Sequence, residues 1–141
     1  TMGEDLLVYQ GTVLQPGNLN GNDFLPQKIG RVQPTYFQQG TFFLSASSEH
    51  VEIPEGYVGY VVEREPALFH LPFASHANAP YVGPRTVFSG RITFENHMYR
   101  NDFIKEGRVQ SKLLLRPLKT PITNKQESRY NNQQGATSSR L

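Results

Sequence analysis

Short runs of aromatic and β-branched residues are separated by glycine and proline along much of this chain, and the clearest of them lie between residues 37 and 62. Two such runs, at 41–45 and 51–53, precede a turn at 54–56, and a third apolar run follows at 57–62. This pattern is typical of compact antiparallel β-sheet. No window of similar length has a convincing helical period. The pattern therefore predicts an all-β fold organised around the 37–62 stretch.

Weaker strand signals lie on either side of this stretch, at 6–13, 88–94 and 111–115. The segments 14–30 and 63–84 are crowded with proline, glycine or asparagine, so we expect irregular connections there. Apolar residues at alternating or capped positions of the predicted strands are expected to form the core. They are Phe42, Leu44, Val51, Ile53, Val58 and Ile92.

The length of 141 residues suits one domain with a core of its own. The chain contains no cysteine, which excludes disulfides, thiolate catalysis and cysteine-based zinc sites. The four histidines show no metal-binding spacing, so we expect no metal site. No apolar run approaches the ~20 residues of a membrane-spanning helix, and no signal-peptide pattern is present, so we expect a soluble protein.

The end of the chain differs in composition from the rest. Residues 120–141 are rich in asparagine, glutamine, serine and threonine, and have too few apolar groups to fold alone. From residue 116 onward, five basic residues and one acidic residue give a charge of +4, whereas the preceding residues carry −2. We therefore predict a β-domain at 1–119 and an extended arm at 120–141, which does not pack on its own domain but crosses to a neighbouring subunit or another protein of a larger assembly. The arm has no run of arginine or lysine and only one aromatic residue, so nucleic acid is not an expected partner.

Four segments follow one another in the order and spacing of a known family. Residues 13–20 resemble an early I-x-P-x-S-x-D-L segment, with asparagine in place of its serine and aspartate. Residues 37–54 follow a pattern that ends in S-T-x-E-x-[VI]-x-[IL]-P, and Val58-Gly59 matches the next V-G. Residues 76–95 resemble H-x-x-A-G-F-I-D-P-G-F-x-G-x-[IL]-T-L-E, with two additional residues. Together they resemble the dCTP deaminase branch of the dUTPase-like superfamily. This resemblance implies a dUTPase-like, distorted antiparallel β-barrel (jelly-roll-like) that assembles as a homotrimer.

The resemblance also identifies candidate site residues. Glu95 matches the glutamate that serves as general acid/base in the deaminases, and Arg64, Ala79 and Tyr81 match positions expected to bind substrate. From the residues alone, each assignment has a simpler alternative. Glu95 can be a strand carboxylate paired with Arg91 or another cross-strand base, and Arg64 can pair locally with its two neighbouring glutamates.

Two departures from the family pattern fall on its chemistry. Glu65 replaces a serine of the G-R-S-S nucleotide loop, and a carboxylate there would repel a triphosphate by several kcal/mol in a poorly solvated pocket. Gly83 replaces an aspartate that the family places near the sugar. Without these contacts a single carboxylate has no positioned substrate, so we expect no turnover of dCTP or dUTP.

The altered motifs therefore favour a non-catalytic structural or assembly module, for example a capsid decoration (cement) protein or another virion protein. The alternative is a divergent dCTP deaminase or dUTP pyrophosphatase that acts on deoxynucleoside triphosphates, with Glu95 as acid/base and Arg64 as phosphate ligand. A third hypothesis is nucleotide binding without turnover. No cofactor is expected, apart from Mg²⁺ accompanying a nucleotide triphosphate in an enzyme. We expect the protein in the virion if it is viral and in the cytoplasm otherwise.

Overall fold

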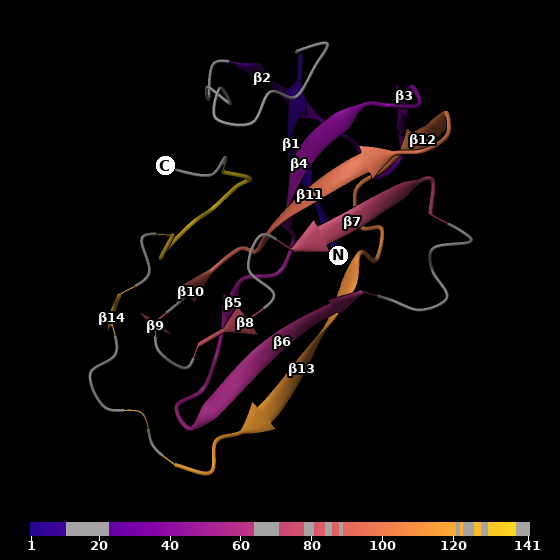
Figure 1. The fold of residues 1–141 in the computed structure, drawn as a ribbon. Helices are drawn as coiled ribbons and strands as arrows, with labels where there is room; N and C mark the ends of the chain where they lie inside the picture. The colour runs from indigo at the N-terminus through magenta and orange to yellow at the C-terminus, as the bar shows by residue number, and fades with distance from the viewer. Residues whose placement is uncertain are drawn as a thin grey trace.

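The computed structural model describes residues 1–10, 23–63, 71–77, 81–83, 86–87, 89–120, 122, 126–127 and 130–137. These residues contain strands and no α-helix, which confirms the predicted all-β class (Figure 1). The strands are β1 (Met2–Tyr9), β2 (Phe24–Lys28), β3 (Thr35–Phe37), β4 (Phe42–Ser47), β5 (Val51–Glu52), β6 (Tyr57–Glu63), β7 (Phe73–Ala77), β8 (Tyr81–Val82), β9 (Thr86–Val87), β10 (Ser89–Gly90), β11 (Thr93–Met98), β12 (Asp102–Ile104), β13 (Ser111–Pro117) and β14 (Gln126–Glu127). Nothing in this part of the chain forms a helix that is long and apolar enough to cross a membrane.

The largest sheet has five antiparallel strands in the order β2-β1-β4-β11-β7. A second, three-stranded antiparallel sheet has the order β13-β6-β8 and lies below the first in Figure 1. Three short pairs, β10-β5, β12-β3 and the parallel pair β14-β9, complete the described part of the chain. Within these residues the sheets stay open-edged and no closed barrel forms. The predicted central stretch supplies β4, which lies in the middle of the large sheet.

The main hydrophobic core covers one face of the five-stranded sheet, here called the inner face. Side chains alternate between the two faces of a strand, so the residues opposite one another in the register share a face. Phe43 of β4 lies opposite Val8 of β1 and Asn96 of β11, and all three are buried on the inner face. The core cluster consists of Met2, Leu6, Val8, Ile29, Phe37, Phe43, Phe73, Met98 and Ile104. A second, smaller cluster is formed by Val82, Ile92 and Phe94, with Val51, Ile53, Val61 and Ala77 packed against it.

Most of the predicted core positions are confirmed, with one error. Leu44, Val58 and Ile92 are buried, and the partly buried Val51 and Ile53 pack on the second cluster. Phe42 is not a core residue. It lies half-buried on the outer face, where its ring centroid is 6.4 Å from that of Tyr9 and 6.3 Å from that of Phe24. The inner position belongs to the neighbouring Phe43, because two consecutive strand residues cannot face the same side.

A network of buried polar side chains lies among the apolar ones on the inner face. The Asn96 side-chain amide donates to the hydroxyl of Ser45 at 2.9 Å and to the carbonyl of Phe43 at 3.2 Å. Gln110, which precedes β13, donates to the same hydroxyl at 2.8 Å and to the Asn96 side-chain oxygen at 3.1 Å. These bonds attach the approach to the second sheet to the centre of the first. The Gln110 side-chain oxygen is buried and accepts no hydrogen bond from the described residues, so the network is not fully satisfied.

We predict that Phe43→Ala lowers the free energy of unfolding by about 3–5 kcal/mol, because it removes a fully buried ring from the main core. The matched control is Phe42→Ala, one residue away on the half-exposed outer face, which should cost less. Urea denaturation of the two variants and the unchanged chain measures both effects. A larger loss for Phe42→Ala than for Phe43→Ala would show that the register of β4 is wrong.

Candidate active site

The structure describes only part of the predicted site. Glu95 lies in β11, and Tyr81 lies in β8, where its backbone pairs with Tyr60. Arg64 and Ala79 fall outside the described residues, as does Glu65, and so does the side chain of Tyr81. The gathering of these residues around one substrate therefore stays a prediction, and the described part of the site is centred on Glu95.

Glu95 lies on the outer face of the five-stranded sheet, opposite the main core. Its neighbours along β11, Phe94 and Asn96, are buried on the inner face, so the alternation turns Glu95 outward together with Thr93 and His97. The outer face here is not a fully solvated surface. Glu95 is half-buried, while Thr93 is buried and His97 exposed.

The two flanks of Glu95 differ in chemistry. On the β4 side it lies opposite Leu44, which is only 3% exposed, and Phe42 and Ala46 are the diagonal neighbours. On the β7 side it lies opposite His76, which is exposed. The register thus places Glu95 between an apolar strand and a histidine, on a strand whose other face is buried in the core.

Glu95 forms no hydrogen bond or ion pair with another described residue. The alternative that it pairs with Arg91 or with another described cross-strand base is therefore wrong. An Nη atom of Arg91 instead lies 3.8 Å from where a Cβ on Gly3 would be, at the start of β1. A half-buried carboxylate without a counter-ion keeps its oxygens available for a proton from water, which is the requirement for general acid/base chemistry.

Residues 130–137 return to the segment 89–93, where β10 ends and β11 begins. Asn132 N–H donates to the carbonyl of Ser89 at 2.6 Å, and the Gln133 carbonyl accepts from Arg91 N–H at 2.9 Å. The Gln133 side-chain amide donates to the Thr93 hydroxyl at 2.5 Å. The expectation that the arm would not pack on its own domain is wrong for these residues. A contact of the arm with another subunit or protein stays a prediction.

A cleft of about 360 Å³ lies between this returning segment and the β1–β2 edge of the sheet. Its lining includes Leu7, Pro26 and Lys28 on one side and residues 134–136 on the other, but not Glu95. The Lys28 ammonium lies 3.3 Å from the carboxylates of both Glu4 and Asp5, and hydrogen bonds to them raise the pKa of Lys28. This cation is therefore already neutralised by the protein and offers no unpaired charge to the cleft.

Gly83 shows how one departure from the family pattern is built into the backbone. Its φ angle is +73°, in the left-handed region that favours glycine. A Cβ there would lie 3.5 Å from the carbonyl oxygen of Tyr57. An aspartate at this position would therefore need a strained backbone. The backbone conformation at residue 83 thus favours the glycine found here over the family's aspartate.

Three residues near Glu95 were not among the sequence-derived candidates. Thr93 could have been inferred, because it lies two residues before Glu95 on the same face of a predicted strand. His76 and Gln133 depend on the strand register and on the path of the chain end, for which single-sequence patterns give no signal. In the described part of the chain, no three or more histidine, aspartate or glutamate side chains gather to hold a metal ion.

Comparison with known proteins gives matches to individual relatives. No family model matches the chain. The "dCTP deaminase, dUMP-forming" proteins of Dictyoglomus thermophilum and Dictyoglomus turgidum are 33% and 32% identical to it over 120 residues. The matched region covers 81% of this chain and 60% of each relative, so the chain spans less than two thirds of the relatives' length.

We predict that Gln133→Ala loosens the returning segment without unfolding the domain. It removes the side-chain bonds to the Thr93 hydroxyl and the Arg91 carbonyl, each of roughly 0.5–1.5 kcal/mol net. Amide hydrogen exchange at Arg91, whose N–H is bonded to the Gln133 carbonyl, should accelerate. Gln134→Ala is the matched control, because this exposed side chain donates locally to the Asn132 carbonyl and not to the sheet. Equal exchange at Arg91 in both variants would contradict the assigned role of Gln133.

Proposed function

Because the chain is a distant homologue of the dCTP deaminases, as its motifs indicate, we propose that it is a divergent enzyme of the dCTP deaminase/dUTPase superfamily. Its proposed reaction is the hydrolytic deamination of a deoxycytidine nucleotide, with dCTP as the first substrate to test. The observation that carries the proposal is Glu95, a half-buried carboxylate at the motif position of the family's acid/base that has no counter-ion among the described residues.

The proposed chemistry needs one group that accepts a proton and later returns it. Water adds to C4 of the cytosine ring, and the exocyclic nitrogen leaves as ammonia, so a proton must move from the water to the departing nitrogen. Glu95 is proposed to accept that proton and to deliver it. The apolar flank formed by Leu44 and Ala46 limits solvation of the carboxylate on one side, which favours proton transfer to the substrate over exchange with bulk water.

Substrate contacts are the less complete part of the proposal. Arg64 is proposed to bind phosphate, and Ala79 and Tyr81 to line the base and sugar site. Glu65 and Gly83 weaken the phosphate and sugar contacts, so a raised KM is expected relative to an enzyme with the full motif. Mg²⁺ would enter bound to the triphosphate. Neither the structure nor the comparisons support a structural or virion role, so the nucleotide-acting alternative takes precedence here.

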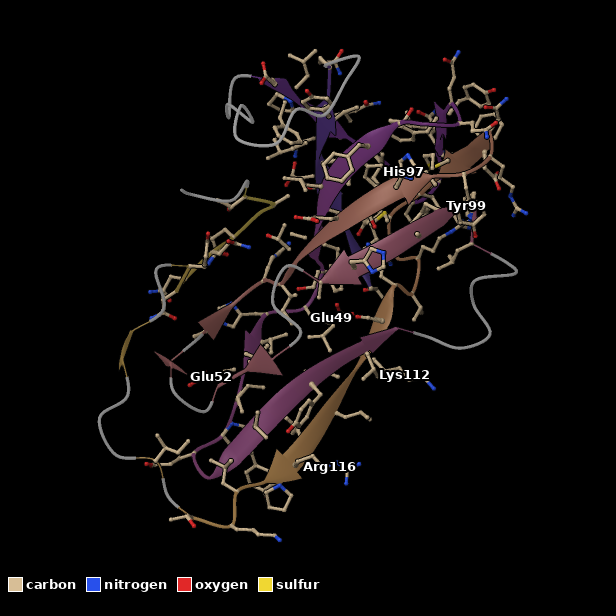
Figure 2. All side chains as sticks on the ribbon, viewed as in Figure 1. Glu49, Glu52, His97, Tyr99, Lys112 and Arg116 are labelled. Carbon is tan, nitrogen blue, oxygen red and sulfur yellow. The ribbon has the colours of Figure 1, made fainter. Side chains whose placement is uncertain are left out.

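We also propose that the sheets belong to a distorted, jelly-roll-like barrel that is completed in a homotrimer. The support is the exposure of β13. Leu113, Leu114 and Leu115 are 38%, 44% and 46% exposed although consecutive residues point to opposite faces, so both faces of this strand are incompletely covered. Lys112 and Arg116 project from the same side of β13 (Figure 2). A neighbouring copy packed on this strand would bury the leucines and leave the two cations at the rim.

The oligomer is tested by Leu114→Glu, which places a charge in the centre of the proposed contact. We expect the mass measured by light scattering to fall from that of a trimer to that of a monomer, because the variant removes apolar surface from the contact and the desolvation of a carboxylate is costly even beside Lys112 and Arg116. Val32→Glu is the control, since Val32 is 90% exposed and lies on another part of the chain. A monomeric unchanged protein, or a Leu114→Glu variant that stays trimeric, would refute the assignment of β13 to the contact.

The activity is tested with the purified protein, dCTP and Mg²⁺, by measuring ammonia release and separating the nucleotide products. We expect deamination, and a loss of about 10²–10⁴-fold in kcat for Glu95→Gln, which keeps the shape but not the basicity of the side chain. Glu52→Gln is the matched control. It replaces an exposed carboxylate on β5 with an amide (Figure 2) and should leave the rate of deamination unchanged. Deamination that survives in Glu95→Gln, or its absence from the unchanged protein, contradicts the proposal; dCTP binding by calorimetry without turnover would support the nucleotide-binding hypothesis instead.

A further inference from the structure

We infer that the proposed homotrimer is a head-to-tail ring, in which a basic surface on β13 of one copy meets an acidic surface beside β5 of the next. This assignment rests on the homotrimer proposed above and adds the two surfaces that meet in it. The basic surface is formed by Lys112 and Arg116, and the acidic surface by Glu52 and Glu55, all of them exposed. Because both surfaces belong to the same chain, every copy carries one of each.

The two cations lie on one face of β13 and have no side-chain partner in the described part of the chain. Alternate residues of a strand point to the same side, so Lys112, Leu114 and Arg116 share a face. Neither cationic side chain forms a hydrogen bond or an ion pair with a described residue. Leu114, between them, is 44% exposed. An apolar side chain flanked by two unpaired cations suits a partner surface that carries negative charge.

The face of β13 that bears the basic surface is turned away from the second core cluster. A Cβ at Gly59 of β6 would lie 2.8 Å from Cδ1 of Ile53 and 3.1 Å from Cδ1 of Leu113, so the side of the strand pair that bears Leu113 packs toward Ile53. Ile53 in turn packs on the second core cluster. The residues of the basic surface alternate with Leu113 along β13 and therefore point to the other side.

The acidic surface lies on the far side of the second core cluster. Val51 and Ile53 pack on that cluster, so the alternation along β5 turns Glu52 away from it. The Glu52 side chain forms no hydrogen bond or ion pair with a described residue, and Glu55 is exposed in the turn that leads to β6. In Figure 2, Glu52 lies to one side of β6, whereas the two labelled cations of β13 lie to the other. The two charged surfaces therefore lie on opposite sides of one part of the molecule.

Charge distinguishes the two ways in which copies of the chain can meet. In a two-fold contact a surface meets itself, so the basic surfaces of two copies would face one another and repel. In a head-to-tail contact the basic surface of one copy meets a different surface of the next, and repetition of this contact closes a ring when the rotation suits. A basic and an acidic surface on opposite sides of one chain fit the second arrangement, which is the one that a trimer requires.

The contact is tested by reversing charges in the full chain and measuring its mass by sedimentation over a range of protein concentrations. One variant reverses the basic surface (Lys112→Glu with Arg116→Glu), and a second reverses the acidic surface (Glu52→Lys with Glu55→Lys). We expect each to raise the concentration at which the trimer half-dissociates by about tenfold or more, because attraction becomes repulsion. The variant with all four changes should recover the trimer, since its surfaces are complementary again. Lys105→Glu, an exposed cation after β12, is the matched control and should leave this concentration unchanged.

The salt dependence of the unchanged chain is a second measurement that needs no variant. A contact between opposite charges weakens as ionic strength rises, so the half-dissociation concentration should increase between about 0.05 and 0.5 M NaCl. A trimer that persists in either reversed variant, that does not return with all four changes, or that is insensitive to salt would overturn the head-to-tail assignment while the homotrimer stands. A chain that is monomeric at every concentration would refute the homotrimer itself and the assignment with it.

Discussion

The buried amide of Asn96 is the constraint on which the rest of this structure depends. It donates to Ser45 and to the carbonyl of Phe43 on β4, and its oxygen accepts from Gln110 on the approach to β13. Leaving such a buried group unpaired costs about 1–3 kcal/mol, and a slip of one residue would carry Asn96 to the opposite face. The network therefore fixes the register of β11, and the same register places Glu95 between Leu44 and His76 on the outer face.

The fold class could be predicted because it depends on composition and spacing, which the sequence displays directly. Alternating apolar runs and glycine-proline turns were sufficient for an all-β antiparallel fold and for most of the core. The assignment of faces was less secure where two bulky apolar residues are adjacent. Either Phe42 or Phe43 could point to the inner face of an alternating strand. Only the partners across the sheet, Val8 and Asn96, determine that Phe43 points inward. The three leucines of β13 present the same ambiguity, since both faces of that strand are partly exposed.

The candidate site was predictable only where a local motif carries it. Glu95 could be identified from the spacing of 76–95, whereas its neighbours come from β4 and β7 through pairing between distant segments. The chain end was misjudged for a physical reason. Its scarcity of apolar groups indicates an arm that does not pack on its own domain, but residues 131–133 are held by hydrogen bonds to Ser89, Arg91 and Thr93, which need no apolar surface.

The altered motifs concern substrate binding, whereas the glutamate that matches the family motif concerns the rate of the chemical step. Where contacts to phosphate and sugar act equally on the bound substrate and on the transition state, their loss mainly weakens binding. A positioned carboxylate acts on the proton transfer itself, so its loss mainly lowers the rate of the chemical step. In the proposed site, Gly83 with its left-handed backbone belongs to substrate binding, and Glu95 belongs to the chemical step. Changed binding motifs therefore do not by themselves imply a non-catalytic protein, because the part of the site that performs the chemistry can persist on a strand that the core keeps in register.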